Sequence, residues 1–183
     1  MQKGAQLGRA KSGSPFNWAL AIQKQKEVVM KGSVFEIYIA DDPKSKMRSI
    51  PEASLVAGKG IEGDRYFNGK GTFSEKLKNN PAVELSLIEK EEIDKFNATH
   101  NQDHNYGDLR RNIITEGFQL NNYVGKEFTI GNIKLKGIRL CEPCPYLAET
   151  VNPLVLPHMV GVAGLRAQII TSGTIKLGDS VNG

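Results

Sequence analysis

The chain has 183 residues, 39% of them hydrophobic and 24% charged, which suits one soluble globular domain with a buried core. Its net charge of +4 comes from residues 1–30, which hold five basic residues and one acidic residue, while the other 153 hold 19 of each sign. This balance gives no case for nucleic-acid binding, and without an apolar run of about 20 residues or an export signal we expect no membrane partner and a cytoplasmic location.

Residues 1–31 are predicted to form a basic N-terminal extension ahead of one domain at residues 32–183. Gly, Ser, Lys and Gln dominate this extension, and we expect its early part to be mobile. Ser14 followed by Pro15 is typical of a helix start and predicts a short helix that carries Trp18. Met30 precedes the first predicted strand and leaves open a second translation start.

From residue 32 onward the patterns are mainly those of β-strands. Strands are predicted for SVFEIYIA (33–40), VELSLI (83–88) and NIIT (112–115). The segment EKEEIDKFNATH (89–100) is typical of a short acidic helix and is expected to bury Ile93 and Phe96.

The clearest hairpin is EFTIGNIKLKGIRL (127–140), in which Gly131 and Asn132 form a two-residue turn. After the turn, the apolar positions change phase at Gly137; they are Ile133, Leu135, Ile138 and Leu140. A strand cannot keep one face buried across such a slip unless it accommodates an extra residue. The sequence therefore predicts a β-bulge at Gly137.

The last two strands are predicted in LRAQIIT (165–171) and TIKLGDSV (174–181), paired through a turn at Ser172 and Gly173. No internal repeat is visible, and helices do not alternate regularly with strands. We therefore expect a mainly β fold, a largely antiparallel closed barrel with a few short helices on its rim. Long loops at 41–82 and 98–112 interrupt this pattern and are candidates for function.

Both cysteines lie in LCEPCPYL (140–147), as Cys141 and Cys144. In a reducing compartment such a pair is more often reactive or metal-bound than a disulfide. A thioredoxin-like redox pair would need a βαβ context, and Pro145 follows directly. A Cys2His2 zinc site that also uses His100 and His104 is a second alternative, although 36 residues separate the histidine pair from the cysteine pair. The interpretation that we favour is one reactive thiol presented by a proline-bracketed loop.

Two further strings combine glycine, arginine and polar residues. GIEGDRYF (60–67) allows close backbone approach to a ligand beside Arg65, although a surface ion pair is the alternative. In GDLRRN (107–112), Arg110 and Arg111 should point to opposite faces, because they are adjacent at a strand entrance. One of them could clamp a phosphate or carboxylate, and a pair of solvated arginines is the alternative.

In their order along residues 32–181, four strings resemble the MOSC domain, which occurs at the C-terminus of molybdenum cofactor sulfurases and in small stand-alone bacterial proteins. They are GIEGDRYF, GDLRRNIITEG, LCEPC and GVAGLRAQIITSGTIKLGDSV. The resemblance implies a β-barrel, similar to the pyruvate kinase barrel, and a role in sulfur handling around the molybdenum cofactor or another metal–sulfur centre.

The resemblance also implies roles for individual residues. Cys144 would carry a transferable sulfur as a persulfide, or bind molybdenum directly. The residues implied to bind the cofactor are Arg65, Arg110, Arg111, Asn112, Gly63, Asp64, Lys44 and Ser45, of which the last two match the family pattern less well. Asn112 would offer amide hydrogen bonds, and the role of Arg166 is open.

A molybdopterin-type molecule is therefore the expected cofactor, and a cysteine desulfurase or a sulfur-accepting protein the expected transient partner. Pyridoxal phosphate is not expected, because the chain is too short to hold a desulfurase domain as well as a barrel. The leading function is sulfur transfer in molybdenum cofactor or metal–sulfur cluster biosynthesis, with a sulfurtransferase as the enzymatic interpretation. The alternatives are a molybdenum-dependent oxidoreductase subunit with Cys144 as metal ligand, and a non-catalytic binding module.

Overall fold

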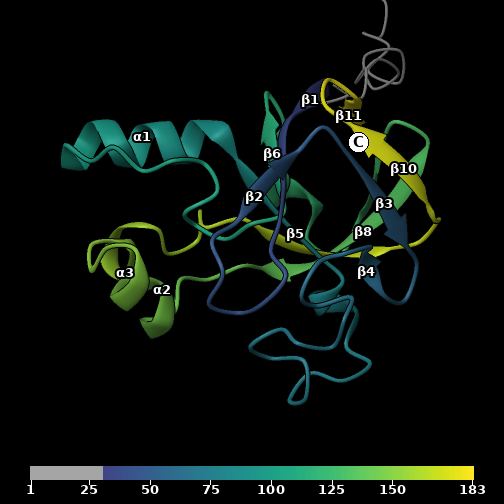
Figure 1. Ribbon diagram of the computed structural model, residues 1–183. Coiled ribbons are helices and arrows are strands. Elements are labelled where there is room, and N and C mark those ends of the chain that lie inside the picture. Colours follow the sequence, from purple (N-terminus) through teal and green to yellow (C-terminus); the bar gives the residue numbers. More distant parts are fainter. Residues whose placement is uncertain (1–30) are drawn as a thin grey trace, which may run out of the picture.

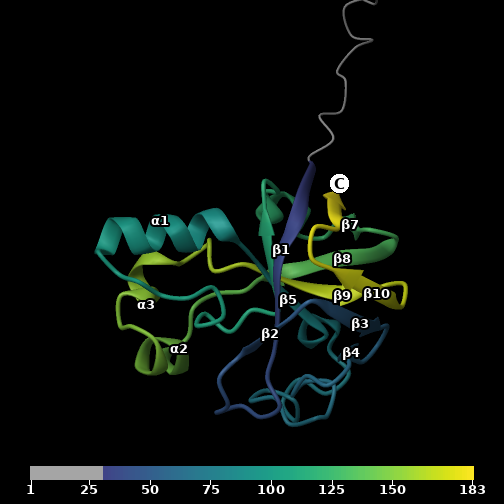
Figure 2. The ribbon, with the colours of Figure 1, turned by 45° about the horizontal axis from the view of Figure 1, so that its top comes forward.

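The computed structural model describes residues 31–183, so the predicted helix near Trp18 and the alternative start at Met30 lie outside the described residues. Figures 1 and 2 show a β-barrel with the α-helices gathered on one side of it. The barrel strands are β1 (Lys31–Ile39), β5 (Leu85–Glu89), β6 (Ile113–Glu116), β7 (Glu127–Ile130), β8 (Ile133–Leu140), β9 (Leu165–Ile169) and β11 (Ser180–Asn182).

The barrel closes because β11 pairs with both β7 and β1, in the order β11-β7-β8-β9-β5-β6-β1. Every neighbouring pair in this ring is antiparallel except β5 and β6, which are parallel. β2 (Arg48–Ile50) extends β1 outside the ring. The expected mainly β, largely antiparallel closed barrel is therefore confirmed.

Short elements decorate this barrel. The helices are α1 (Lys90–His100), α2 (Pro145–Thr150) and α3 (Val155–His158), with 3-10 turns η2 (Pro81–Val83) and η3 (Leu120–Tyr123). α1 confirms the predicted acidic helix, and Ile93 and Phe96 are buried as expected. No helix within residues 31–183 is both long and apolar enough to cross a membrane.

The core has two parts, and β5 and β6 contribute to both. Leu87 and Ile113 point into the barrel, where they join apolar residues from all the other barrel strands. Ile88 and Ile114, the next residue on each strand, pack against the three helices. Because both faces are covered, these two strands carry nearly continuous apolar runs.

The predicted pairing of the last two strands is wrong. β10 (Gly173–Lys176) does not pair with β9 but with β3 (Glu52–Val56), which also pairs with β4 (Gly60–Ile61). β9 lies between β5 and β8 instead. A short turn at Ser172 and Gly173 suggested a hairpin, but both edges of β9 are already occupied, so the chain continues into a second, three-stranded sheet.

The predicted bulge is confirmed. In the β8–β9 ladder Gly137 lies opposite Ala167, while Arg139 lies opposite Arg166, so β8 holds one extra residue, Ile138. A Cβ atom on Gly137 would lie 2.0 Å from the carbonyl oxygen of Tyr123. Only glycine fits this close approach, and after it the side chains of β8 have exchanged faces.

We expect Gly137→Ala to lower the free energy of unfolding by about 3 kcal/mol or more, because the clash involves backbone rather than a side chain that can move. The control is Gly125→Ala, where φ is +78° but nothing lies within 4 Å, so only about 1 kcal/mol of backbone strain is expected. Urea unfolding of both variants measures the difference. Equal destabilisation would contradict the steric account of the bulge.

Candidate functional site

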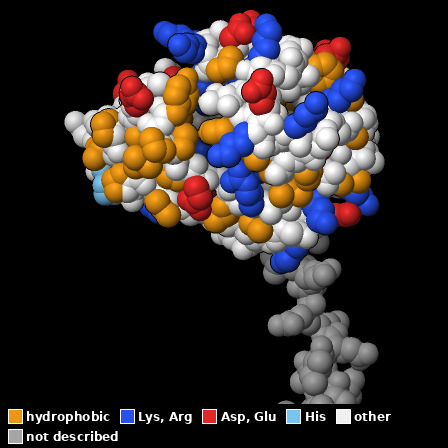
Figure 3. Space-filling model, turned by 90° about the horizontal axis from the view of Figure 1, so that it is seen from below, with side chains coloured by type: hydrophobic (Ala, Val, Ile, Leu, Met, Phe, Trp, Pro, Cys, Tyr) orange, Lys and Arg blue, Asp and Glu red, His pale blue; other side chains and the backbone are white. Residues whose placement is uncertain are grey.

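The two cysteines line a cavity of about 260 Å³ at one end of β8 and β9. Five of the side chains around it are arginines, and one is a carboxylate, Glu142. The arginines are Arg65, Arg110, Arg111, Arg139 and Arg166. Figure 3, which views the protein from the side of the long loop after β4, shows Lys and Arg side chains gathered near the middle of that face. The cavity therefore carries a large excess of positive charge.

The structure separates the two thiols. Cys141 is 3% exposed, and its backbone N–H donates to the carbonyl oxygen of Gly164 at 2.7 Å. Cys144 is half-buried and directly precedes α2, whose first turn bonds to its carbonyl oxygen. Both are free thiols. Both cysteines line the cavity, and Cys144 is the less buried of the two thiols.

The structure gives no support to the other interpretations of the cysteine pair. Among residues 31–183 no group of three His, Cys, Asp or Glu is arranged to hold a metal ion, and the rings of His100 and His104 pack against Phe96 instead. The pair does lie between a strand and a helix. However, it is Cys144 rather than Cys141 that precedes the helix, opposite to the thioredoxin arrangement.

Arg111 is buried, with 6% of its surface exposed, and holds the walls of the cavity together. Its Nε donates to Ala163 at 2.8 Å, Nη1 to Leu109 at 3.1 Å and Nη2 to Cys141 at 3.2 Å, all at backbone carbonyl oxygens. Burial lowers the pKa of Arg111, and the nearby cysteines oppose that shift. The guanidinium therefore fixes the cysteine loop in place, and no carboxylate of residues 31–183 forms an ion pair with it.

Arg110 and Arg111 both line the cavity, and both precede β6, so the strand alternation behind their predicted opposite directions does not apply. Arg110 has φ +60°, and its guanidinium donates to the carbonyl oxygens of Ser45 and Pro43, both at 2.8 Å. Tyr146 in α2 also donates to Pro43, at 3.1 Å. These bonds hold the loop that carries Lys44 against the rim of the cysteine cavity.

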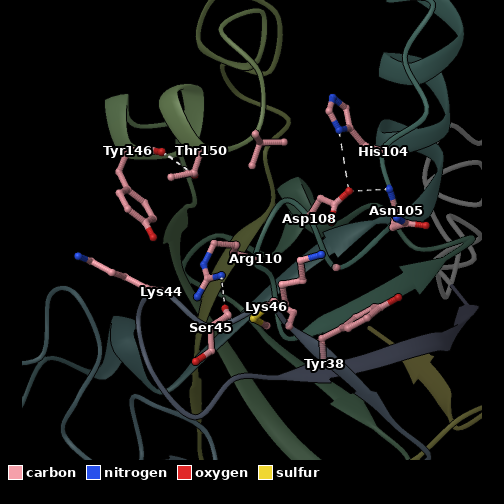
Figure 4. A pocket seen from close by; sticks show the side chains of 13 residues that line it. Tyr38, Lys44, Ser45, Lys46, His104, Asn105, Asp108, Arg110, Tyr146 and Thr150 are labelled. Carbon is pink, nitrogen blue, oxygen red and sulfur yellow. Dashed lines mark hydrogen bonds and ion pairs between the residues drawn. The ribbon is translucent and has the colours of Figure 1, made fainter.

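A second cavity of about 580 Å³ adjoins the first and shares Arg110 and Tyr146 with it. Lys44 and Ser45 line this second cavity, so the structure does not place them around the cysteines. Figure 4 shows Arg110 near the middle of its lining, beside Ser45 and below Tyr146 and Thr150. The two cavities together give an extended, polar and basic surface next to Cys144.

The GDR string forms a buried anchor. Gly63 has φ +83°, a conformation that favours glycine, and Asp64 follows it almost fully buried. The Asp64 carboxylate accepts hydrogen bonds from the backbone N–H groups of Ala40 and Tyr66 and from Arg65 Nη1, which is 3.0 Å away. Burial lowers the pKa of Arg65, and the Asp64 charge opposes that shift. Asp64 therefore positions Arg65 at the cavity wall.

Asn112 belongs to the same network. Its side-chain nitrogen donates to the carbonyl oxygen of Tyr38 at 3.1 Å and to the Asp64 carboxylate at 3.3 Å, and its oxygen accepts from the Ser86 hydroxyl at 2.7 Å. These bonds join β1, β5 and the GDR loop. The amide is thus committed to positioning the site, and its predicted contact with a ligand stays a prediction.

Two cavity residues were not assigned from the sequence. Arg139 was not singled out, and the role of Arg166 was left open, yet both line the cavity. The Tyr66 ring lies 5.2 Å from Arg65 Cζ and 5.8 Å from Arg166 Cζ, so it stacks between two cations. The signal for Arg139 was present in the phase slip at Gly137, which implies that the residues after it change faces.

Arg111→Met should lower the free energy of unfolding by about 3 kcal/mol or more, because three buried carbonyl oxygens lose their donors. Arg48→Met is the matched control, since Arg48 is mostly exposed and only 3.6 Å from Asp41; its loss should cost under about 1 kcal/mol. Urea unfolding compares the two. A similar loss in both variants would show that Arg111 does not hold the cysteine loop.

Comparison with known proteins agrees with this architecture. Similar solved structures are YuaD from Bacillus subtilis (TM-score 0.70, 17% identity, 84% of this chain and 96% of that chain covered) and YiiM from Geobacillus stearothermophilus (0.62, 12%, 83% and 75%). YiiM from Escherichia coli is another (0.58, 17%, 84% and 69%), and at these identities the likeness shows the fold. A comparison with curated protein sequences finds no match.

The sequence profile of the MOSC domain family matches residues 74–182, which include the arginine–asparagine string, both cysteines and the final strands. This match spans more than half of the chain and includes strands β5 to β11. The protein belongs to the MOSC domain family, which is associated with proteins of the molybdenum cofactor.

Proposed function

We propose that this protein transfers sulfur in molybdenum cofactor or metal–sulfur cluster biosynthesis, and that Cys144 carries the sulfur as a persulfide. The observation that supports this most directly is the placement of one half-buried thiol, Cys144, in a small cavity lined by five arginines and one carboxylate. A reactive sulfur in a positive cavity suits chemistry in which both the carrier and its partners are anions.

A thiolate can accept a sulfane sulfur and hold it as a persulfide, which a later nucleophile removes. The persulfide is an anion, and nearby guanidinium groups favour charged sulfur over its neutral form. Arg111 is one such guanidinium: it donates to the Cys141 carbonyl oxygen, and both cysteines oppose the lowering of its pKa by burial. Cys141 is buried beside it and would not compete for the donor.

The donor set fits a molybdopterin-type molecule, which carries a phosphate and a polar ring system. Guanidinium groups bind such anions through paired hydrogen bonds, and Arg65 and Arg111 would hold one at the cysteine cavity. The adjoining cavity, with Lys44 and Ser45 in its lining, offers room for the remainder. When bound, this molecule would supply the metal centre that accepts the sulfur.

The remaining residues of the site would prepare it. Gly63 lets the backbone turn tightly, Asp64 orients Arg65, and Asn112 ties the loop to the barrel. Arg110 would keep the loop at Pro43 closed over the boundary between the two cavities. A cysteine desulfurase is the proposed source of sulfur, an acceptor protein is a further proposed partner, and the reducing cytoplasm is the proposed location.

The second candidate is a molybdenum-dependent oxidoreductase subunit in which Cys144 binds the metal. The same observation favours it, since a soft thiolate at the cavity surface is a suitable ligand. The two candidates differ in one respect: a carrier leaves its sulfur removable and its cysteine free in the resting protein, whereas a metal ligand keeps Cys144 occupied.

The test is the intact mass of the reduced protein after incubation with a cysteine desulfurase and free cysteine, with the modified residue located by peptide mapping. We expect one added sulfur on Cys144 that dithiothreitol removes, because Cys144 is the less buried of the two thiols that line the cavity. Cys141→Ala is the control and should still be loaded, whereas Cys144→Ser should not. Loading of Cys141, or of neither cysteine, would contradict the carrier function, and a molybdopterin retained through Cys144 would favour the oxidoreductase.

A further inference from the structure

Arg139 and Arg166 form a pair of like charges, and the proposed sulfur-transfer function assigns no role to either residue. They lie directly opposite each other across β8 and β9, after the bulge has moved Arg139 onto the outer face of the barrel. Without the extra residue, Arg139 would share the inward face of Leu135 and Gly137, both of which are buried. The bulge therefore brings two guanidinium groups together at the cysteine cavity.

Among residues 31–183 no carboxylate forms an ion pair with Arg139 or Arg166. Burial opposes the charge of Arg166, but the neighbouring Cys141 and Tyr66 side chains outweigh it and raise the pKa of Arg166. Cross-strand neighbours of like charge destabilise a sheet, so an arrangement of this kind needs a compensating partner. Arg166 Nε is buried without a hydrogen-bond partner among the described residues, and Arg139 Nη1 donates only to the carbonyl oxygen of Leu140. Glu142, the one carboxylate of the lining, accepts a hydrogen bond from the N–H of Gly161.

The size of the cavity indicates what would compensate the pair. Its volume of about 260 Å³ lies just below the range of roughly 300–1,000 Å³ that is typical of sites for drug-sized ligands. A small anion with two charges would fill it without using the adjoining cavity. The planar fork of an arginine binds an oxyanion through two parallel hydrogen bonds, as to two oxygens of a sulfonate or phosphate group.

We propose that Arg139 and Arg166 bind the sulfonate end of a small sulfur donor of the thiosulfate class, so that its outer sulfur reaches Cys144. This inference rests on the proposed carrier function and deepens it by naming a class of donor. Cys144 could then receive sulfur from a small molecule as well as from a cysteine desulfurase. The observation that carries it is an arginine pair without a carboxylate ion pair among residues 31–183, in the same cavity as Cys144, the less buried of the two thiols.

The step is a nucleophilic substitution at the outer sulfur of thiosulfate. The Cys144 thiolate attacks the outer sulfur of thiosulfate, and a new sulfur–sulfur bond forms to Cys144. The sulfur–sulfur bond of thiosulfate breaks, and its electron pair leaves with sulfite. Three negative charges are present before and after the step, and the transferred sulfur needs no external oxidant or reductant. The arginine pair would favour the reaction by holding sulfite as its charge develops.

The experiment compares two sulfur donors with the full-length, reduced protein. Thiosulfate carries the sulfonate group, whereas diallyl trisulfide is neutral and lacks it. The Cys144 thiolate attacks an outer sulfur of the trisulfide, forms an allyl disulfide on Cys144 and releases allyl persulfide. Loading of Cys144 is followed by intact mass and sulfite release by a coupled assay. We expect thiosulfate to load Cys144 with release of one sulfite per persulfide, and sulfate, which has the anionic group but no sulfur to donate, to inhibit competitively.

The variants Arg139→Gln and Arg166→Gln test the pair itself. The ratio of the loading rate with thiosulfate to that with diallyl trisulfide should fall about tenfold or more in each, because a charged hydrogen bond to the sulfonate is lost. Arg48→Gln, a surface arginine outside the cavity, should leave this ratio unchanged. Using the ratio removes any general effect of a variant on folding or on Cys144.

Three outcomes would overturn the inference. Loading by diallyl trisulfide or a desulfurase, but not by thiosulfate, would leave the carrier function standing and remove the donor class. Loss of loading with every donor would contradict the carrier function as well. Inhibition by inorganic phosphate together with no loading from thiosulfate would assign the arginine pair to a phosphate group of the sulfur acceptor instead.

Discussion

Within residues 31–183, the buried guanidinium of Arg111 bonds only to backbone carbonyl oxygens, those of Leu109, Cys141 and Ala163. Burying a cation without a carboxylate partner is costly, and here burial lowers its pKa. The arrangement persists because one guanidinium satisfies three loop carbonyls at once. The same bonds bring the cysteine loop and the segment before β9 to the start of β6. An anion in the cavity would offset the cost, so the interaction that builds the site also prepares it for anionic ligands.

Much of the fold could be predicted because its signals are local. The alternation in VELSLI, the acidic helix over 89–100 and the GN turn each depend on residues close in sequence, and each was confirmed. The phase slip at Gly137 predicted the bulge for the same reason. The pairing of β10 was wrong because it depends on which distant strand has a free edge, and β3, more than 110 residues earlier, provides one. A short turn between two strands cannot decide that competition.

The same distinction, between local sequence signals and contacts of distant segments, decides which features of the site could be predicted. The strings that point to the MOSC domain located Cys144, Arg65 and Arg111, and the structure brings these three to one cavity. The sequence could not show that Asn112 has its amide fully engaged, nor that Lys44 and Ser45 line the adjoining cavity, because both facts depend on contacts between segments far apart. It also missed Arg139, whose direction depends on the bulge two residues earlier. A local irregularity of the backbone thus supplies part of the charge around the cysteines.

The central claim is that Cys144 is the one accessible thiol and lies in a positive cavity. Its alkylation by iodoacetate, which is negative, and by iodoacetamide, which is neutral, tests both parts, with the urea-unfolded protein as reference. The account predicts that Cys144 reacts well ahead of Cys141, and that the folded protein prefers iodoacetate more than the unfolded chain does, by a margin that shrinks with added salt. Equal reaction of both cysteines, or a ratio no higher than in the unfolded chain, would contradict it.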